Sequence, residues 1–585
     1  MKESSKHEKQ DVVKLLSWSG GLNEELDPSA ISLNELSAAQ NIQYYDWTDG
    51  EGNKQTGIEL RHGTTKISSY ALPAGADVEA CYYYKTHTQY ILATSSKLYY
   101  LGVVAEQGSL APIEIGSISG VPTFTEFNGK LIVHDSGVTK AWNGTTFETL
   151  ACTYEDENIG TGDGAETHFT GTLSNPTVTV SSITITATTA AGATLTVTDN
   201  GEGALIGNVN GGGTNTITYS TGAYNVTFST APVDGGSVLA TYKKVAGAPK
   251  SKGGFVRNER LYMWGSIDYP SRLFYSGTSD TGGEYEWDSS SGGGYLDFDK
   301  DDGYALLGCI NYSQSVILFK QNKLGRLDNF PGDSIFRIEP LNSEIPSLSH
   351  RAILSGGSIL TTLSSFGWLA VNPGSIYDEQ QTYTVLSKRI NTNIKKYASS
   401  LAFAEFNPFD NQLWLALHSG SAYLNYIYVI DIPQARVSKF QFAFTHSCFK
   451  YVDNKMLIGG IDGNLYQLST DNTNYLDNSV SYATNTFFAT ADTDWGLPLN
   501  DKITKKLHIK CHAATAPSGN VKLYKDHSST ALETIAIPAT ANVRKIVSNN
   551  HNRYKDLMIR VETIAATGGI KFGGIYIKTA LVGDK

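Results

Sequence analysis

The chain has 585 residues, 40% of them hydrophobic and 18% charged, and its formal net charge is −11. This length predicts about two to four domains, and the composition is that of a globular protein, which excludes a disordered or fibrous chain. The negative charge argues against a surface that holds nucleic acid tightly, because such a surface needs clustered Lys and Arg.

Residue usage also bears on fold class and compartment. Gly (57 residues) and Tyr (33) are abundant, and glycine turns joining aromatic strands indicate an all-β chain. The cysteines form no CxxC motif and are odd in number, which predicts reduced thiols rather than a disulfide framework or zinc site, as expected after synthesis in a reducing cytoplasm. They are Cys81, Cys152, Cys309, Cys448 and Cys511. No stretch is apolar enough for a signal peptide or membrane span, so we expect no membrane insertion.

The first part of the chain is predicted to be a separate N-terminal arm over residues 1–47. Its start is polar, and flexible turns are expected at Gly20-Gly21 and Asp27-Pro28. Ser32 and Glu35 have capping-box spacing, which predicts a short helix over residues 33–40.

Hairpin signals then fill residues 48–159 and 247–483. Short apolar runs joined by turn residues recur, for example at 130–144, 258–277 and 311–329. They return every roughly 40 to 60 residues, which is the spacing of propeller blades. We therefore predict a β-propeller with roughly six to eight blades, seven preferred. Two consecutive β-sandwiches are the alternative architecture.

Two further β domains are predicted from changes in composition. Residues 160–246 are dominated by Thr, Gly, Asn, Ser and Val, and their length suits an immunoglobulin-like β-sandwich inserted into the propeller. Residues 484–585 are predicted to form a C-terminal β-sandwich. There Lys506, His508 and Lys510 alternate with apolar residues, which indicates a sheet with one face in water.

Motifs that would indicate chemistry are weak. The acidic run 297–303 resembles a calcium loop, but it lacks the required Gly and the bidentate Glu, so a solvated turn is favoured. Residues 278–285 loosely match the Asp-box turn of sialidases, yet no pair of carboxylates stands out. His508 and His512 are expected at the surface rather than as ligands. We predict no catalytic residues, no metal and no cofactor, and hence no enzyme.

Several segments, in order, resemble a family of phage proteins. GGLN at 20–23 and SAAQNI at 37–42 resemble the opening of the nozzle, or tail tubular B, proteins of short-tailed bacteriophages and the related DNA-stabilisation proteins. NERLYMWG…YPSRLFYSG at 258–277 is similar to their central stretch, and DWGLPLNDKITKKLHI at 494–509 to their C-terminal block. The matches reach both ends of the chain, although each motif consists of common residues.

The resemblance implies a structural component of the phage tail. Such a protein would be made in the host bacterial cytoplasm and would form a hexameric ring at the distal end of the virion tail. It would dock on the adjacent adaptor or tubular ring and on tail fibres or spikes, close the tail, and then conduct viral DNA without sequence-specific binding. An acidic lumen would let DNA slide. Assembly contacts are expected from Trp18, Gly20, Gly21, Leu22, Asn23, Gln40 and Asn41.

Two other functions compete with this one. Tyr- and Trp-rich hairpins and the immunoglobulin-like insert would suit a tail propeller that binds host glycan, although most such aromatics are needed for strand packing. A glycosidase is supported only by the single Asp-box-like turn.

Overall fold

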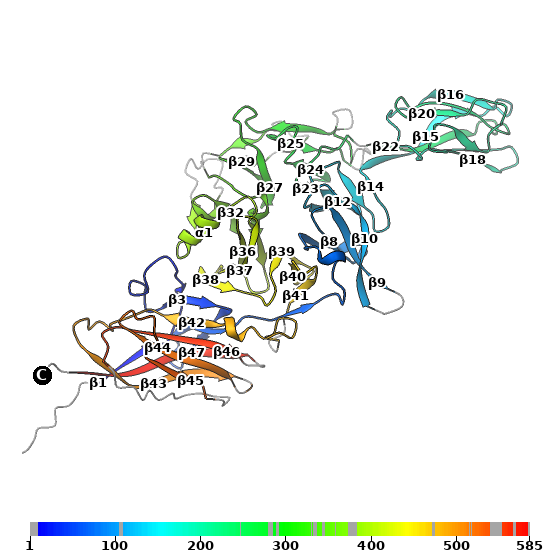
Figure 1. The fold of residues 1–585 in the computed structure, drawn as a ribbon. Helices are drawn as coiled ribbons and strands as arrows, with labels where there is room; N and C mark the ends of the chain where they lie inside the picture. The colour runs from blue at the N-terminus through cyan, green and yellow to red at the C-terminus, as the bar shows by residue number, and fades with distance from the viewer. Residues whose placement is uncertain are drawn as a thin grey trace, which may run out of the picture. The chain divides into compact units, whose positions relative to one another are not determined.

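The computed structural model describes residues 10–104, 109–245, 247–278, 285–287, 292–328, 330–331, 336–341, 345–356, 359–372, 383–470, 474–513, 515, 517–538, 553–565 and 569–582. The chain forms two compact units. Unit 1 contains residues 1–117, 310–326 and 339–585, and unit 2 contains residues 118–309 and 327–338. The one α-helix among the described residues is α1 (Asn391–Tyr397). Strands are the dominant regular structure among the described residues, as predicted (Figure 1).

Seven four-stranded antiparallel sheets follow one another along the described chain. Blade 1 contains β7 (Ala80–Tyr84), β8 (Gln89–Ala93), β9 (Lys97–Val104) and β10 (Ser109–Ser117). Blade 2 contains β11 (Thr123–Phe127), β12 (Lys130–His134), β13 (Lys140–Trp142) and β14 (Phe147–Thr149). Blade 3 contains β23 (Gly253–Arg257), β24 (Arg260–Trp264), β25 (Arg272–Tyr275) and β26 (Gly294–Asp297). Blade 4 contains β27 (Leu306–Tyr312), β28 (Ser315–Lys320), β29 (Leu324–Leu327) and β30 (Glu339–Pro340).

Blades 2 and 3 belong to unit 2, whereas blade 1 and the remaining three blades belong to unit 1. Blade 5 contains β31 (Leu354–Gly356), β32 (Ile359–Ser364), β33 (Gly367–Val371) and β34 (Tyr383–Val385). Blade 6 contains β35 (Phe403–Asn407), β36 (Gln412–Ser419), β37 (Ala422–Asp431) and β38 (Arg436–Phe440). Blade 7 contains β39 (His446–Val452), β40 (Lys455–Gly460), β41 (Leu465–Leu468) and, from much earlier in the chain, β6 (Thr64–Lys66). The predicted β-propeller is confirmed.

Tight turns explain why these segments fold as hairpins. Asn128-Gly129, Asn258-Glu259 and Asp453-Asn454 each join two paired strands, and all of these residues have positive φ. Two consecutive residues with positive φ make a type I′ turn, whose twist matches that of the flanking strands. Asn, Asp and Gly tolerate this conformation best, so the sequence marks the first and third turns directly.

The inserted domain is a two-sheet β-sandwich, as predicted. One sheet contains β15 (Ala151–Thr161), β17 (Thr184–Thr188), β18 (Thr194–Asp199), β19 (Leu205–Gly207) and β22 (Ser237–Val245), and the other contains β16 (His168–Thr172), β20 (Thr216–Thr218) and β21 (Ala223–Thr227). Alternate residues such as Val226, Phe228 and Ala240 are fully buried between the sheets. The domain begins before residue 160, because the acidic strand β15 pairs along its length with β22.

The terminal sandwich contains strands from both ends of the chain. Its five-stranded sheet contains β1 (Gln10–Leu15), β4 (Ile42–Thr48), β5 (Lys54–Leu60), β43 (Lys502–Ala513) and β47 (Ile570–Leu581). Its six-stranded sheet contains β2 (Gly21–Leu22), β3 (Glu35–Gln40), β42 (Phe487–Thr490), β44 (Ser518–Lys525), β45 (Glu533–Ala536) and β46 (Leu557–Ala565). In Figure 1 the blue N-terminal strands accordingly lie among orange and red C-terminal ones.

This pairing differs from the separate arm expected for residues 1–47. The expected boundary cuts through β4, and the helix predicted over residues 33–40 is wrong, because β3 occupies that segment. The capping-box contact does form, since the Ser32 N–H donates to a Glu35 carboxylate oxygen at 3.0 Å. However, β3 pairs with β42 and buries Leu36 and Ala39, and these tertiary interactions outweigh the local helix signal.

The terminal sandwich and two blades share one hydrophobic core inside unit 1. A continuous cluster of buried side chains runs from Trp18 and Phe488 in the sandwich to Trp368 in blade 5 and Leu415 in blade 6. Burial of apolar area contributes about 25 cal/mol per Å², so a shared core of this kind resists separation of its parts. The described N-terminal and C-terminal strands are thereby fixed to these blades.

Candidate functional site

Most of the residues predicted to make assembly contacts are buried within unit 1. The side chains of Trp18 and Leu22 are 0% exposed, and Gly20 and Gly21 are buried. A Cβ on Gly21, whose φ is +73°, would lie 2.8 Å from the backbone nitrogen of Val437 in blade 6. Only glycine allows that approach. These residues therefore hold the chain's own N-terminal strands in place, and a role in contacts with other molecules stays a prediction.

Asn23 orders the loop that follows β2. Its amide donates to a Glu35 carboxylate oxygen at 3.2 Å, and its carbonyl oxygen accepts from the backbone of Glu25 and Leu26. Glu35 also forms an ion pair with Arg389 at 2.6 Å. Burial disfavours the Glu35 charge, but the hydrogen bonds from Arg389, Ser32 and Asn23 outweigh it and lower the pKa of this carboxyl.

Asn41 lies at the corner where the chain leaves one sheet of the terminal sandwich and enters the other. Its φ is 58°, a left-handed conformation that Asn tolerates better than most residues. Its side-chain oxygen accepts from Arg61 Nε at 2.9 Å and from the Gln441 N–H at 2.7 Å. The neighbouring Gln40 donates to the Gln441 side chain at 2.5 Å and is only half-buried. The corner is thus tied to the segment after blade 6.

Glu24 and Glu25 connect the same loop to the propeller. Glu24 forms an ion pair with Lys439 of blade 6 at 2.9 Å and accepts a hydrogen bond from Tyr428 at 2.8 Å. Glu25 accepts from the backbone and hydroxyl of Thr392 at the start of α1. The exposed residues of this loop that remain available to another molecule include Leu26 and Leu33, whose side chains are 53% and 47% exposed.

The weak chemical motifs remain unsupported by geometry. Asp297 forms an ion pair with Arg272 at 2.8 Å. Within the described ranges, no three His, Cys, Asp or Glu side chains are grouped so that they could hold a metal ion. Residues 279–284 of the Asp-box-like stretch lie outside the described residues. In the part of the chain that the structure describes, no helix has the length and apolar character needed to cross a membrane.

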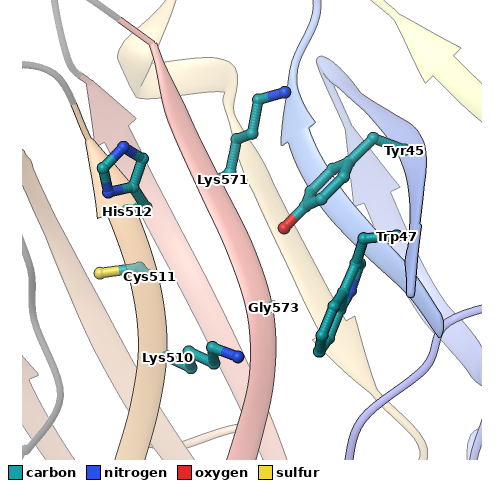
Figure 2. A pocket seen from close by; sticks show the side chains of 7 residues that line it. All are labelled: Tyr45, Trp47, Lys510, Cys511, His512, Lys571 and Gly573. Carbon is teal, nitrogen blue, oxygen red and sulfur yellow. The ribbon is translucent and has the colours of Figure 1, made fainter. Parts of the chain in front are cut away.

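A hollow of about 350 Å³ opens on the water-facing side of the five-stranded sheet of the terminal sandwich. It is lined by Tyr45, Trp47, Lys510, Cys511, His512, Lys571 and Gly573. Figure 2 shows the two aromatic side chains on one side of Gly573 and the β43 residues on the other. The sequence predicted a wet face on β43, and His512 is exposed there as expected, but nothing in it indicated that β4 supplies the opposite wall.

Two glycines, which have no side chain, shape the hollow. Tyr45 lies across the strand from Gly57, and a Cβ on Gly57 would lie 2.3 Å from the phenol ring, so the ring occupies the space above this glycine. Gly573 leaves the adjoining space open. A Cβ there would meet its nearest neighbours, Lys510 Cδ and the Tyr45 oxygen, at 3.5 and 3.7 Å.

The two lysines at the hollow contact aromatic rings. Lys510 Nζ lies 4.5 Å from the centre of the Trp47 ring, and Lys571 Nζ lies 4.8 Å from that of Tyr45. Such cation–π contacts contribute about 0.5–1 kcal/mol at exposed sites and orient the ammonium groups. Lys571 also forms an ion pair with Glu59 at 2.9 Å. Burial, assisted by the Glu59 charge, raises the pKa of Tyr45 to about 12, so its hydroxyl remains a neutral donor.

Comparison with known proteins identifies structural likeness only. No family model matches the chain, and no curated protein matches it. The computationally designed Ika8 protein matches with 11% identity and a TM-score of 0.33, over 69% of this chain and 99% of its own. BamB from Moraxella catarrhalis gives the same identity and TM-score over 69% and 100%. AztD from Citrobacter koseri has 10% identity and a TM-score of 0.30, over 80% and 97%. Likeness at this level carries no inference about function.

Proposed function

We propose that the protein is a structural component of a bacteriophage tail that forms the distal nozzle ring, closes the tail and then conducts DNA during ejection. The observation that carries the proposal is the location of the segments that resemble this family. GGLN contributes β2, SAAQNI contributes parts of β3 and β4, and the block at 494–509 leads into β43. These three build the terminal sandwich, whereas the family-like segment at 258–277 forms β24 and β25 of blade 3, so the resemblance extends over the terminal sandwich and the propeller.

This framework suits a part that must bear load. Strands from both chain ends are paired in the terminal sandwich, and its core continues into blades 5 and 6. A ring that closes a pressurised tail needs subunits whose terminal strands stay paired under force. Under this proposal the protein assembles as a hexamer, docks on the adjacent tail ring and on fibres or spikes, and lets viral DNA pass without sequence-specific binding.

Electron microscopy together with native mass measurement tests the proposal. The purified protein would be imaged alone and mixed with tail components encoded by the same genome. Six-fold rings with a central opening, in either preparation, are the expected result. Single particles that never assemble in either preparation would contradict the nozzle function.

The predicted role of the N-terminal residues in assembly contacts must be tested by substitutions that preserve the fold rather than by deletion. Removing residues through Ile42 would take β1, β2 and β3 out of the terminal sandwich and unfold it, so loss of assembly would carry no information. The exposed Leu26 and Leu33 can instead be changed together to Asp, with exposed Leu401→Asp as the matched control. We expect the double variant to fold yet fail to enter tails, while the control enters normally. Normal incorporation of the double variant would exclude this loop from the interface.

A further inference from the structure

The water-facing side of the five-stranded sheet in the terminal sandwich carries a concentration of positive charge in a chain whose net charge is −11. The face presents side chains from β1, β43 and β47, which are neighbours in the sheet. Its basic residues are Lys14, Lys506, Lys510, Lys571 and Lys578, with His508 and His512 between them. We call this set the basic face.

Strand register brings like charges together on the basic face. Lys506 lies directly opposite Lys578. Like charges in directly opposed positions destabilise a sheet. Among the described carboxylates, Glu59 neutralises Lys571, whereas no described carboxylate forms an ion pair with Lys506, Lys510 or Lys578. An arrangement that disfavours folding locally, with no compensating carboxylate among the described residues, is expected where a ligand supplies the missing charge.

The hollow at one end of the basic face provides a defined space beside these charges in which a ligand could bind. Its volume of about 350 Å³ falls within the range of about 300–1,000 Å³ typical of small-molecule sites. The Trp47 and Tyr45 rings form one wall, and their contacts with Lys510 and Lys571 hold both ammonium groups at the opening. A ligand that fits here combines an anionic group for Lys510 with a ring that packs against aromatic side chains.

We propose that this hollow binds an acidic saccharide, a pyranose ring that carries a carboxylate or another anionic group. The electron-rich faces of Trp and Tyr attract the positively polarised C–H groups on a sugar-ring face. The ammonium group of Lys510, which forms no ion pair with a described carboxylate, binds the acidic substituent, and the neutral Tyr45 hydroxyl can donate to a ring hydroxyl. Gly573 leaves the space that the ring would occupy. This inference is independent of the proposed tail function.

A polynucleotide is a poorer fit to the same surface. Long nucleic acids are bound through many phosphate contacts along an extended basic surface, and the strongly negative net charge opposes their approach. A single hollow with one ammonium group that no described carboxylate neutralises suits one charged ring. Nucleic acid is therefore an outcome of the test that would contradict the proposal.

Isothermal titration calorimetry on the full-length protein, at about 50 mM salt to limit screening, tests the site. The probes are a tetrasaccharide of galacturonate, a neutral glucose tetrasaccharide and a short oligothymidylate. We expect saturable binding of the uronate only. Lys510→Gln should weaken it about tenfold, because a charge-assisted contact is lost. Lys395→Gln, which removes an exposed lysine of α1, is the matched control and should leave the affinity unchanged.

A second variant fills the hollow without removing any contact. Gly573→Val adds methyl groups where a Cβ meets only ordinary van der Waals neighbours, so the fold should persist, as checked by an unchanged melting temperature. Uronate binding should be lost. The proposal is overturned if the uronate does not bind, if the neutral sugar or oligothymidylate binds as tightly, if Lys395→Gln weakens binding as much as Lys510→Gln, or if folded Gly573→Val still binds.

Discussion

Arg61 and Asp477 form a fully buried ion pair between residues that lie 416 positions apart in the chain, with both side chains 0% exposed. The two N–O contacts measure 2.9 and 2.5 Å, and Arg61 Nε donates to Asn41. The guanidinium also lies 3.9 Å from the centre of the Tyr482 ring. Every polar group of Arg61 is therefore satisfied within the corner that joins the terminal sandwich to blades 6 and 7.

Removing one partner of this pair should be costly. Asp477→Ala leaves a buried guanidinium without its counter-charge, and we expect a loss of about 3–5 kcal/mol in the stability of unit 1. The measurement is the melting temperature of the corresponding calorimetric transition, because a chain of two units need not unfold in one step. Arg61→Met combined with Asp477→Leu should recover much of that loss.

An exposed ion pair provides the control. Lys97 and Glu114 are 44% and 46% exposed and lie 2.7 Å apart. Lys97→Ala should cost less than about 1 kcal/mol, because water and salt already weaken such pairs. If Asp477→Ala shifts the transition no more than Lys97→Ala does, the buried pair does not hold the corner.

The left-handed conformation of Asn41 leads to a second prediction. Asn41→Gly removes the side-chain hydrogen bonds to Arg61 and Gln441 but keeps a residue that adopts a φ of 58° easily. Asn41→Ala removes the same bonds and adds backbone strain of about 1–2 kcal/mol. We expect both variants to melt below the wild type, with Ala the lower. Equal melting temperatures would mean that the corner relaxes away from this conformation.

The blades could be predicted from the sequence because their signals are local. Asn128-Gly129 and Asp453-Asn454 mark turns between strands that are neighbours in the chain. The terminal sandwich could not be predicted in the same way. β1 pairs with β47, so Gln10 lies opposite Ala580, and no local pattern indicates which distant strand an edge will choose. The Ser32–Glu35 spacing led to a wrong helix prediction for the same reason. The local contact between these residues forms, but the segment is a strand because it pairs with the distant β42.

The hollow, too, could be predicted only in part from the sequence. Alternation along β43 correctly predicts that Lys506, His508 and Lys510 face water. The opposite wall comes from Tyr45 and Trp47, more than 450 residues earlier, and the space between depends on Gly573. A glycine in a strand indicates a bulge or a close approach, but sequence alone does not say what approaches.

The thiols of Cys81 and Cys448 give a third prediction. Their sulfur atoms lie 3.8 Å apart between β7 of blade 1 and β39 of blade 7, and the two residues are 6% and 3% exposed. The hydrogen bond with Cys448, together with burial, raises the pKa of Cys81 well above its usual value. Both thiols are buried, and at Cys81 the thiolate, which is the reactive form, is also disfavoured, so iodoacetamide should not label either residue at pH 8 until denaturant is added.

Peptide mass mapping after labelling provides the measurement. Ser95→Cys, at an exposed position between β8 and β9, is the positive control and should be labelled within minutes in the native protein. Labelling of Cys81 at the rate of the introduced cysteine, without denaturant, would show that blades 1 and 7 separate readily at this seam.

His134 in blade 2 should make unit 2 sensitive to acid. The ring is 1% exposed, lies 2.8 Å from Ser251 Oγ and 3.1 Å from Thr125 Oγ1, and burial lowers its pKa to about 3. In the unfolded chain its pKa returns to about 6.5. Between these values the unfolded state binds a proton that the folded state does not, so this contribution to stability falls as pH decreases, by up to about 1.4 kcal/mol per pH unit.

The variant His134→Gln keeps hydrogen-bonding groups at this position but does not titrate. At pH 7.5 we expect it to melt below the wild type, because the packing around the imidazole is lost. As the pH is lowered from 7.5 to 4.5, the wild type alone loses the His134 contribution, so the difference between the two melting temperatures should shrink. Melting curves recorded in parallel across this range give the answer directly. A constant difference would mean that His134 becomes protonated within the folded unit without cost, for instance by turning toward water, and that the fully buried neutral ring does not describe the protein in mild acid.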